Sequence, residues 1–94
     1  MHAYGYEHIY HDKYLRMVAD GFEFASVWIK LPAGRQGFAV RLKAFGEITK
    51  WINANAVGGL HQTCEANADA NGMFTYGYHF ADTATGFAFK LRFG

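Results

Sequence analysis

The segment Gly37–Lys43 and its near copy Gly86–Arg92 constrain the fold of this chain more than any other feature. Glycine, phenylalanine, alanine and leucine occupy the same places in both segments, and arginine and lysine are exchanged at two basic positions. Both segments alternate apolar and polar residues with a period of two, which is typical of a strand with one buried side. Seven residues are too few to establish a duplication, because a strand pattern after a glycine turn also arises independently.

Each copy follows a second alternating run across a short loop, so we predict two antiparallel hairpins. The first joins Ser26–Leu31 to Phe38–Lys43, and the second joins Thr75–Phe80 to Phe87–Arg92. The loops contain the proline, glycine and aspartate residues that turns require. We prefer the register that gives each hairpin one almost wholly apolar side, because a shift by one residue would bring charges there.

Further strands are expected nearer the N-terminus. Asp20-Gly21, a strong hairpin-turn signal, lies between Tyr14–Ala19 and Phe22–Phe24. Tyr4–Tyr10 also alternates and would form a further edge strand. Unpaired backbone groups of an exposed edge, at Tyr4–Tyr10 or at Phe87–Phe93, would allow a homodimer, and the sequence leaves open which edge is free. The segment Leu60–Ala70 fits a strand, a helix or a loop, and the sequence leaves this choice open.

One helix is predicted near Gly46–Val57. Ile48, Trp51 and Ile52 form an apolar stripe with the spacing i, i+3 and i+4, and Gly58-Gly59 ends the helix. The expected fold class is α+β: an antiparallel β-sheet built from hairpins, with one α-helix packed on its apolar face.

The composition favours one sheet-rich domain, which we assign to residues 1–94. The chain contains nine Phe, six Tyr and two Trp, residue types that favour strands. A single cysteine excludes an internal disulfide and is typical of a reducing compartment, so we expect a cytoplasmic protein. No apolar run is long enough to span a membrane, and residues 1–10 lack the pattern of a secretory signal, so no membrane partner is expected.

The polar face of the predicted hairpins is basic and carries no acidic residue, although the net charge of the chain is only +1. Trp28 and Arg41 would form a cross-strand cation–π pair, and both residue types are enriched at interface hot spots. Solvation alone also explains such a face, because an uncovered sheet needs charges to stay in solution. The residues that we predict to bind a partner are Trp28, Lys30, Arg41, Lys43, His79, Lys90 and Arg92.

The sequence also contains residues with possible metal or catalytic chemistry. His8 with His11 and His61 with Cys64 are two short pairs of zinc-ligand types, but a strand directs positions three apart to opposite faces. Cys64 with His61 or His79 has the residue types of a nucleophile and its base. A lone cysteine in an apolar run is more often a small buried hydrophobe, and no phosphate-binding glycine loop is present. We therefore expect no enzyme activity, no metal and no cofactor.

These features together predict a small binding protein. We expect it to dock through the basic and aromatic sheet face on a larger protein or a nucleoprotein complex. Phages and mobile elements make many proteins of this size that inhibit host machines such as bacterial immunity complexes, so an inhibitor of the anti-CRISPR kind is one form of this expectation, based on class and size only. The alternative is a domain that binds nucleic acid directly with the same face, although its net charge of +1 is low for such a domain.

Overall fold

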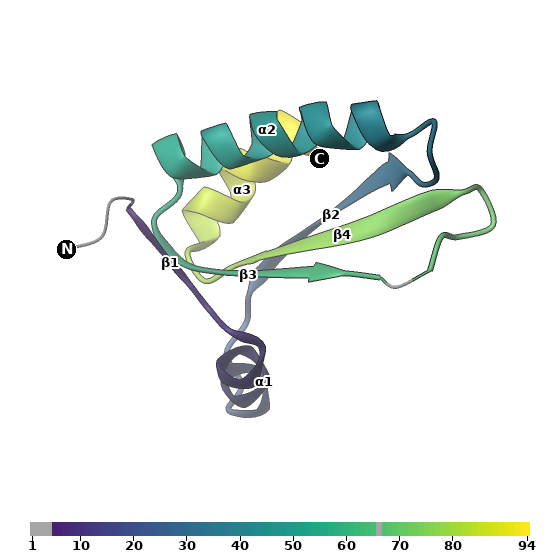
Figure 1. Cartoon of the computed structure of the whole chain (residues 1–94). Helices are drawn as coiled ribbons and strands as arrows, with labels where there is room; N and C mark the ends of the chain where they lie inside the picture. Colours follow the sequence, from purple (N-terminus) through teal and green to yellow (C-terminus); the bar gives the residue numbers. More distant parts are fainter. Residues whose placement is uncertain (1–4, 66) are drawn as a thin grey trace.

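The computed structural model describes residues 5–65 and 67–94. In these residues the chain forms a four-stranded sheet and three helices, which is an α+β architecture (Figure 1). In chain order the elements are β1 (Tyr6–His8), α1 (His11–Ala19), β2 (Ala25–Pro32), α2 (Phe38–Asn55), β3 (Gly58–Cys64), β4 (Met73–Phe80) and α3 (Thr83–Phe93).

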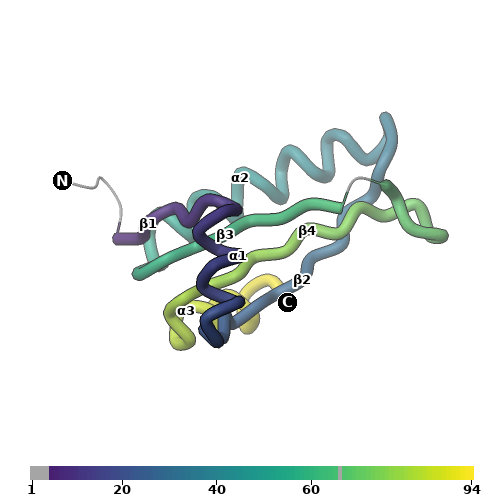
Figure 2. Tube along the Cα trace, turned by 90° about the horizontal axis from the view of Figure 1, so that it is seen from below, coloured from purple at the N-terminus to yellow at the C-terminus, as the bar shows by residue number. Residues whose placement is uncertain are grey.

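The sheet is mixed, which corrects the prediction of a purely antiparallel sheet. Its strand order is β1-β3-β4-β2, in which β1 and β3 are parallel while β4 is antiparallel to both β3 and β2. Helices α2 and α3 lie on one side of the sheet, and α1 crosses the other side (Figures 1 and 2). Two helices therefore cover the apolar side where one was predicted, and a third helix covers part of the polar side.

Both predicted hairpins are wrong in their second arm. The two similar segments, Gly37–Lys43 and Gly86–Arg92, lie at the start of α2 and within α3 instead of in strands. A six-residue alternation is too short to exclude a helix, and alanine, leucine, lysine and arginine are strong helix formers. In α2 the segment continues into the helical spacing of Ile48 and Ile52, so the predicted helix is present but begins at Phe38.

Strand β4 is the hydrogen-bonding partner that both β2 and β3 share. Ser26–Leu31, which was expected to pair with Phe38–Lys43, pairs with β4 instead, and Leu31 lies opposite Phe74. On its other side β4 pairs with β3. In the segment Leu60–Ala70, which the sequence left open, the residues as far as Cys64 belong to β3, the described residues after it form neither strand nor helix, and Ala66 lies outside the described residues.

The N-terminal part agrees only partly with the predictions. A short edge strand is present at Tyr6–His8, while Tyr4 lies outside the described residues. Tyr14–Ala19, predicted as a strand, belongs to α1, and Asp20-Gly21 ends this helix instead of joining two strands. Phe22–Phe24 leads into β2 without forming a strand.

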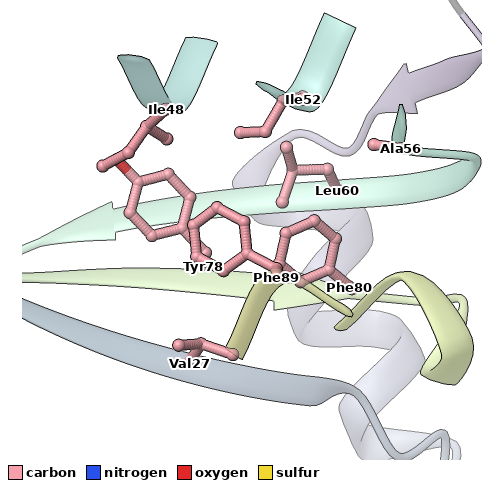
Figure 3. Packing of buried hydrophobic residues seen from close by; sticks show 8 residues of the cluster. All are labelled: Val27, Ile48, Ile52, Ala56, Leu60, Tyr78, Phe80 and Phe89. Carbon is pink, nitrogen blue, oxygen red and sulfur yellow. The ribbon is translucent and has the colours of Figure 1, made fainter. Parts of the chain in front are cut away.

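The core lies between the sheet and the pair of helices α2 and α3 (Figure 3). The rings of Phe80 and Phe89 are fully buried, and their centroids are 5.0 Å apart. Full burial of a phenylalanine side chain contributes up to about 3 kcal/mol to folding. The other buried members of the cluster are Val27, Ile48, Ile52, Ala56, Leu60 and Tyr78.

Two local features allow helices to follow directly after β2 and β4. A Cβ atom on Gly37 would lie 2.9 Å from the carbonyl oxygen of Ala33, so the tight connection into α2 requires glycine. Asp82 caps α3, since its Oδ2 accepts hydrogen bonds from Thr85 N at 2.9 Å and Thr85 Oγ1 at 2.7 Å. Asp82, which lies in the segment predicted to be the loop of the second hairpin, therefore starts a helix.

Candidate functional site

We call the side of the sheet opposite α2 and α3 the open face. Residues that are partners across neighbouring strands point to the same side of a sheet. The pairing therefore places Trp28, Lys30 and His79, three of the predicted binding residues, on the open face. Helix α1 crosses one end of this face and leaves the rest uncovered (Figure 2). The residues that the pairing places on the open face of the long strands are Ser26, Trp28, Lys30, Pro32, His61, Thr63, Met73, Thr75, Gly77 and His79.

The covered end of the open face is built around two buried histidines. His61 and His79 keep only 5% and 3% of their surface exposed. Tyr14 of α1 lies over both, with its ring centroid 4.3 Å from that of His61 and 5.1 Å from that of His79. His61 is fixed by a 2.7 Å hydrogen bond between its Nδ1 and the carbonyl oxygen of Ile9. These contacts hold α1 against the sheet.

His79 links three strands through its imidazole ring. Its Nδ1 lies 2.6 Å from Ser26 Oγ of β2, and its Nε2 lies 3.0 Å from Thr63 Oγ1 of β3. Burial and, to a smaller extent, the charge of His61 lower the pKa of His79, so its neutral form is favoured. A neutral imidazole has one donor and one acceptor nitrogen, and two hydroxyl groups satisfy both. We assign His79 to the support of the sheet and not to a contact with a partner.

The exposed end of the open face is dominated by Trp28. Its side chain is 55% exposed, although it lies near the middle of β2. Gly77 is its partner on β4, and a Cβ atom there would be 2.6 Å from Trp28 Cζ3. The indole therefore lies over the bare backbone of Gly77, and its edge meets the ring of His79 at a centroid distance of 5.1 Å.

Lys30 lies beside Trp28 on the open face and is already paired. Its Nζ donates a hydrogen bond to Asp69 Oδ2 at 2.9 Å. This hydrogen bond raises the pKa of Lys30 and lowers the pKa of Asp69. The strands of the open face carry no acidic side chain, as predicted, but Asp69 reaches Lys30 from the loop before β4 and neutralises its charge.

Arg41 is not the cross-strand partner of Trp28. It lies in the first turn of α2, where its Nη1 donates hydrogen bonds to the carbonyl oxygens of Pro32 at 2.6 Å and Gly34 at 3.0 Å. Its guanidinium also lies 5.5 Å from the centroid of the Phe74 ring. Arg41 stabilises the connection between β2 and α2, and the predicted Trp28–Arg41 pair does not form.

The remaining basic residues predicted to bind a partner lie on the other side of the sheet. Lys43 is an exposed residue of α2, and Lys90 and Arg92 are exposed residues of α3. The guanidinium of Arg92 lies over the ring of Phe93 at 4.6 Å. The predicted basic face is therefore divided: Trp28, Lys30 and His79 are on the open face, and the other basic residues belong to the helical layer.

The residues considered for a metal or a thiol nucleophile are spread over several elements. His11 and His61 approach each other, with ring centroids 5.6 Å apart. His61 and Cys64 point to opposite sides of β3, as the strand geometry predicted. Cys64 is exposed and not buried as its apolar neighbourhood suggested. Among the described residues, no group of three or more His, Cys, Asp or Glu could hold a metal ion.

Tyr14, which was predicted to lie in a strand, is the main residue of the candidate site that the sequence did not reveal. The signals for a helix were Asp12, an acidic residue in the first turn, and the spacing of Tyr14 and Met17, which are the half-buried residues of α1. Stacking on histidines from β3 and β4 depends on the tertiary fold and leaves no pattern in the sequence.

Comparisons with protein-family models, curated proteins and solved structures find no match to this chain. In the part of the chain that the structure describes, no helix is both long and apolar enough to cross a membrane.

Proposed function

We propose that this chain is a small non-enzymatic binding protein that docks on a larger protein or a nucleoprotein complex with the exposed end of its open face. The observation that carries the proposal is Trp28, a large aromatic side chain that is 55% exposed on an uncovered part of a sheet. Tryptophan is enriched among the residues that dominate the free energy of protein association. Its position over Gly77 fixes the indole, so little side-chain entropy would be lost on binding.

The surroundings of Trp28 support a polar rim around one aromatic anchor. Lys30 and Asp69 form an exposed ion pair next to it, and such a pair can exchange its hydrogen bonds with a partner at the edge of an interface. Thr63 and Thr75 add hydroxyl groups on the neighbouring strands. Lys30 is the only basic side chain that the strands place at this end of the open face, and Asp69 neutralises its charge. The partner therefore does not have to be acidic.

Two finer statements belong to the same proposal. The protein would act in the cytoplasm, which is consistent with its single unpaired cysteine. A phage-type inhibitor of a host immunity complex is the specific form that we consider, and it is supported only by the small size of the chain, 94 residues.

The proposal is tested by affinity capture from nuclease-treated lysate of the native cells. The tagged wild type is compared with a Trp28→Ala/Lys30→Glu variant and with a matched control, Lys90→Glu/Arg92→Glu, which changes charge on the helical side. We expect the wild type and the control to retain one stoichiometric partner that the open-face variant loses, while circular dichroism shows all three to be folded. Equal capture by all three proteins, or no capture by the wild type, would contradict the proposal.

The same experiment separates the nucleic-acid alternative. Recovery of nucleic acid without nuclease, and of nothing after nuclease, would favour direct nucleic-acid binding. Two to four phosphate contacts would then give a slope of roughly −2 to −4 in the logarithm of affinity against the logarithm of salt concentration.

A further inference from the structure

The free edge of β3 is a second surface with recognisable chemistry, separate from the open face. β1 pairs with β3 only from Gly58 to Leu60. The last hydrogen bond on this side runs from Ile9 N to the carbonyl oxygen of Leu60 at 2.8 Å, after which the chain turns into α1. Among residues 5–65 and 67–94, no strand pairs with the rest of β3 on this side. The second half of the strand therefore has an open edge.

The hydrogen bonds to β4 identify which backbone groups the open edge presents. Glu65 N donates to Thr75 O at 3.0 Å, and Ala81 N donates to Gly59 O at 2.8 Å. In an antiparallel ladder the residues that bond to a given neighbour alternate along the strand. The residues between them, Gln62 and Cys64, therefore direct their N–H and C=O groups away from β4 and toward the open edge.

A pocket of about 360 Å³ lies directly beside these groups, between the sheet and α2. Phe45, Ile48 and Thr49 of α2 line it from the helix, and Tyr76 and Tyr78 of β4 line it from the sheet. The third side is the open edge itself, because the three residues from Gln62 to Cys64 also line the pocket. Backbone groups and pocket thus form one groove along β3.

The lining of this groove is electrically neutral. It contains no Lys, Arg, Asp, Glu or His side chain. Burial raises the pKa of Tyr78 to about 12 and also raises the pKa of Tyr76, so both hydroxyl groups stay protonated at physiological pH. A charged side chain placed in this pocket would lose its hydration without gaining a partner of opposite charge. The complementary occupant is an uncharged, largely apolar side chain.

β2 forms the other edge of the sheet, and its chemistry is different. Lys30 and Pro32 occupy its second half, and a charged side chain and a residue without an N–H group both discourage the addition of a further strand. In contrast, the open half of β3, from His61 to Cys64, contains neither a proline nor a lysine.

We propose that the groove between β3 and α2 binds an extended peptide segment of a partner protein, which adds to β3 as a strand and places one apolar side chain in the pocket. β1 already forms hydrogen bonds with the first half of this edge of β3, from Gly58 to Leu60. The peptide would pair with the second half of the same edge. Strand addition supplies affinity through the backbone and selectivity through alternate side chains. This site lies on the helical side of the sheet edge, and it does not depend on docking through Trp28.

The test uses a random dodecapeptide library displayed on phage as the probe. Peptides selected on the whole chain are synthesised, and their affinities are measured by isothermal titration calorimetry. The pocket is blocked by Thr49→Trp, which fills it from an exposed helical position, and the matched control is Lys50→Trp on the next, also exposed, residue. A second set of peptides carries N-methyl groups at alternate positions, which removes ladder donors while the protein stays unchanged.

We expect the selected peptides to share an apolar residue and to shift the amide NMR signals of Gln62 and Cys64 most strongly. Their affinity should fall at least about tenfold with Thr49→Trp and with N-methylation of the peptide, and it should not fall with Lys50→Trp. No enriched peptide, or peptides that bind the Thr49→Trp protein as well as the wild type, would overturn the proposal. A concentration-dependent dimer that Thr49→Trp abolishes would also overturn it, because the occupant would then be a second copy of this chain.

Discussion

The sharpest test of the fold compares two phenylalanines of α3 that are two positions apart. Phe89 is fully buried against Trp51, Tyr78 and Phe80, while Phe87 is 65% exposed. In a helix, positions two apart point in directions that differ by about 200°. In the hairpin that alternation predicts, both rings would lie on the apolar side of one strand. Substitution of each by alanine therefore separates the two structures.

We expect Phe89→Ala to lower the free energy of unfolding by about 3–5 kcal/mol, since it removes a buried ring and leaves a cavity. Phe87→Ala should change it by no more than about 0.5 kcal/mol, because the lost contacts are few and alanine favours helix. With a urea m-value of about 1.5 kcal/mol/M, the midpoint falls by about 2–3 M for Phe89→Ala. If Phe89→Ala prevents folding, Phe89→Leu supplies a milder change in the same direction. Equal losses for both positions would refute the helical assignment.

Three further predictions concern the open face and the edge of β3. Gly77→Ala should lower the free energy of unfolding by about 1–3 kcal/mol, because the new Cβ would be 2.6 Å from Trp28 Cζ3 and 2.8 Å from His79 Nε2; unchanged urea stability would contradict the packing of the indole. The lowered pKa of His79 means that the unfolded chain takes up its proton first as the pH falls below about 6.5, so stability should decrease from there toward the folded-state pKa, and His79→Gln should remove this part of the decrease. Urea midpoints that are equally pH-dependent in both proteins would show that His79 is not responsible. The exposed thiol of Cys64 should react with a thiol reagent in the native protein, and reaction only after unfolding would place it in the core.

The sequence predicted the first arm of each hairpin correctly. Ser26–Leu31 and Thr75–Phe80 are strands, and their alternation is long enough to define which side is buried. Asn71-Gly72, a residue pair typical of turns, forms the turn before β4, with Gly72 at a φ of 74° that glycine adopts without strain. Local signals of this kind depend only on neighbouring residues, so they can be found without the tertiary structure.

The second arms show why alternation misled the prediction. Phe87–Arg92 alternates as a strand does, yet Phe89 and Phe93 are also four apart and pack together in α3, with ring centroids 4.9 Å apart. The deciding signal was Asp82, whose side chain caps the helix at Thr85. A capping residue and a turn residue are chemically alike, so the choice between them depends on where β4 finds its partners.

The candidate site was predictable in part for the same reason. Trp28 and Lys30 are on one side of a real strand, and their shared exposure follows from the period of two. Arg41 was misplaced together with the strand to which it was assigned. The covering of His61 and His79 by α1 brings residues far apart in the sequence together, and no local pattern predicts it.

Photo-crosslinking can show whether a partner docks on the exposed end of the open face. A photoreactive phenylalanine analogue is placed at position 28, on the open face, or at position 87, a somewhat more exposed position on the helical side. Both proteins are irradiated in nuclease-treated lysate of the native cells. We expect one discrete cross-linked partner from position 28 and none from position 87. A partner that is cross-linked only from position 87, or equally from both positions, would contradict docking on the open face.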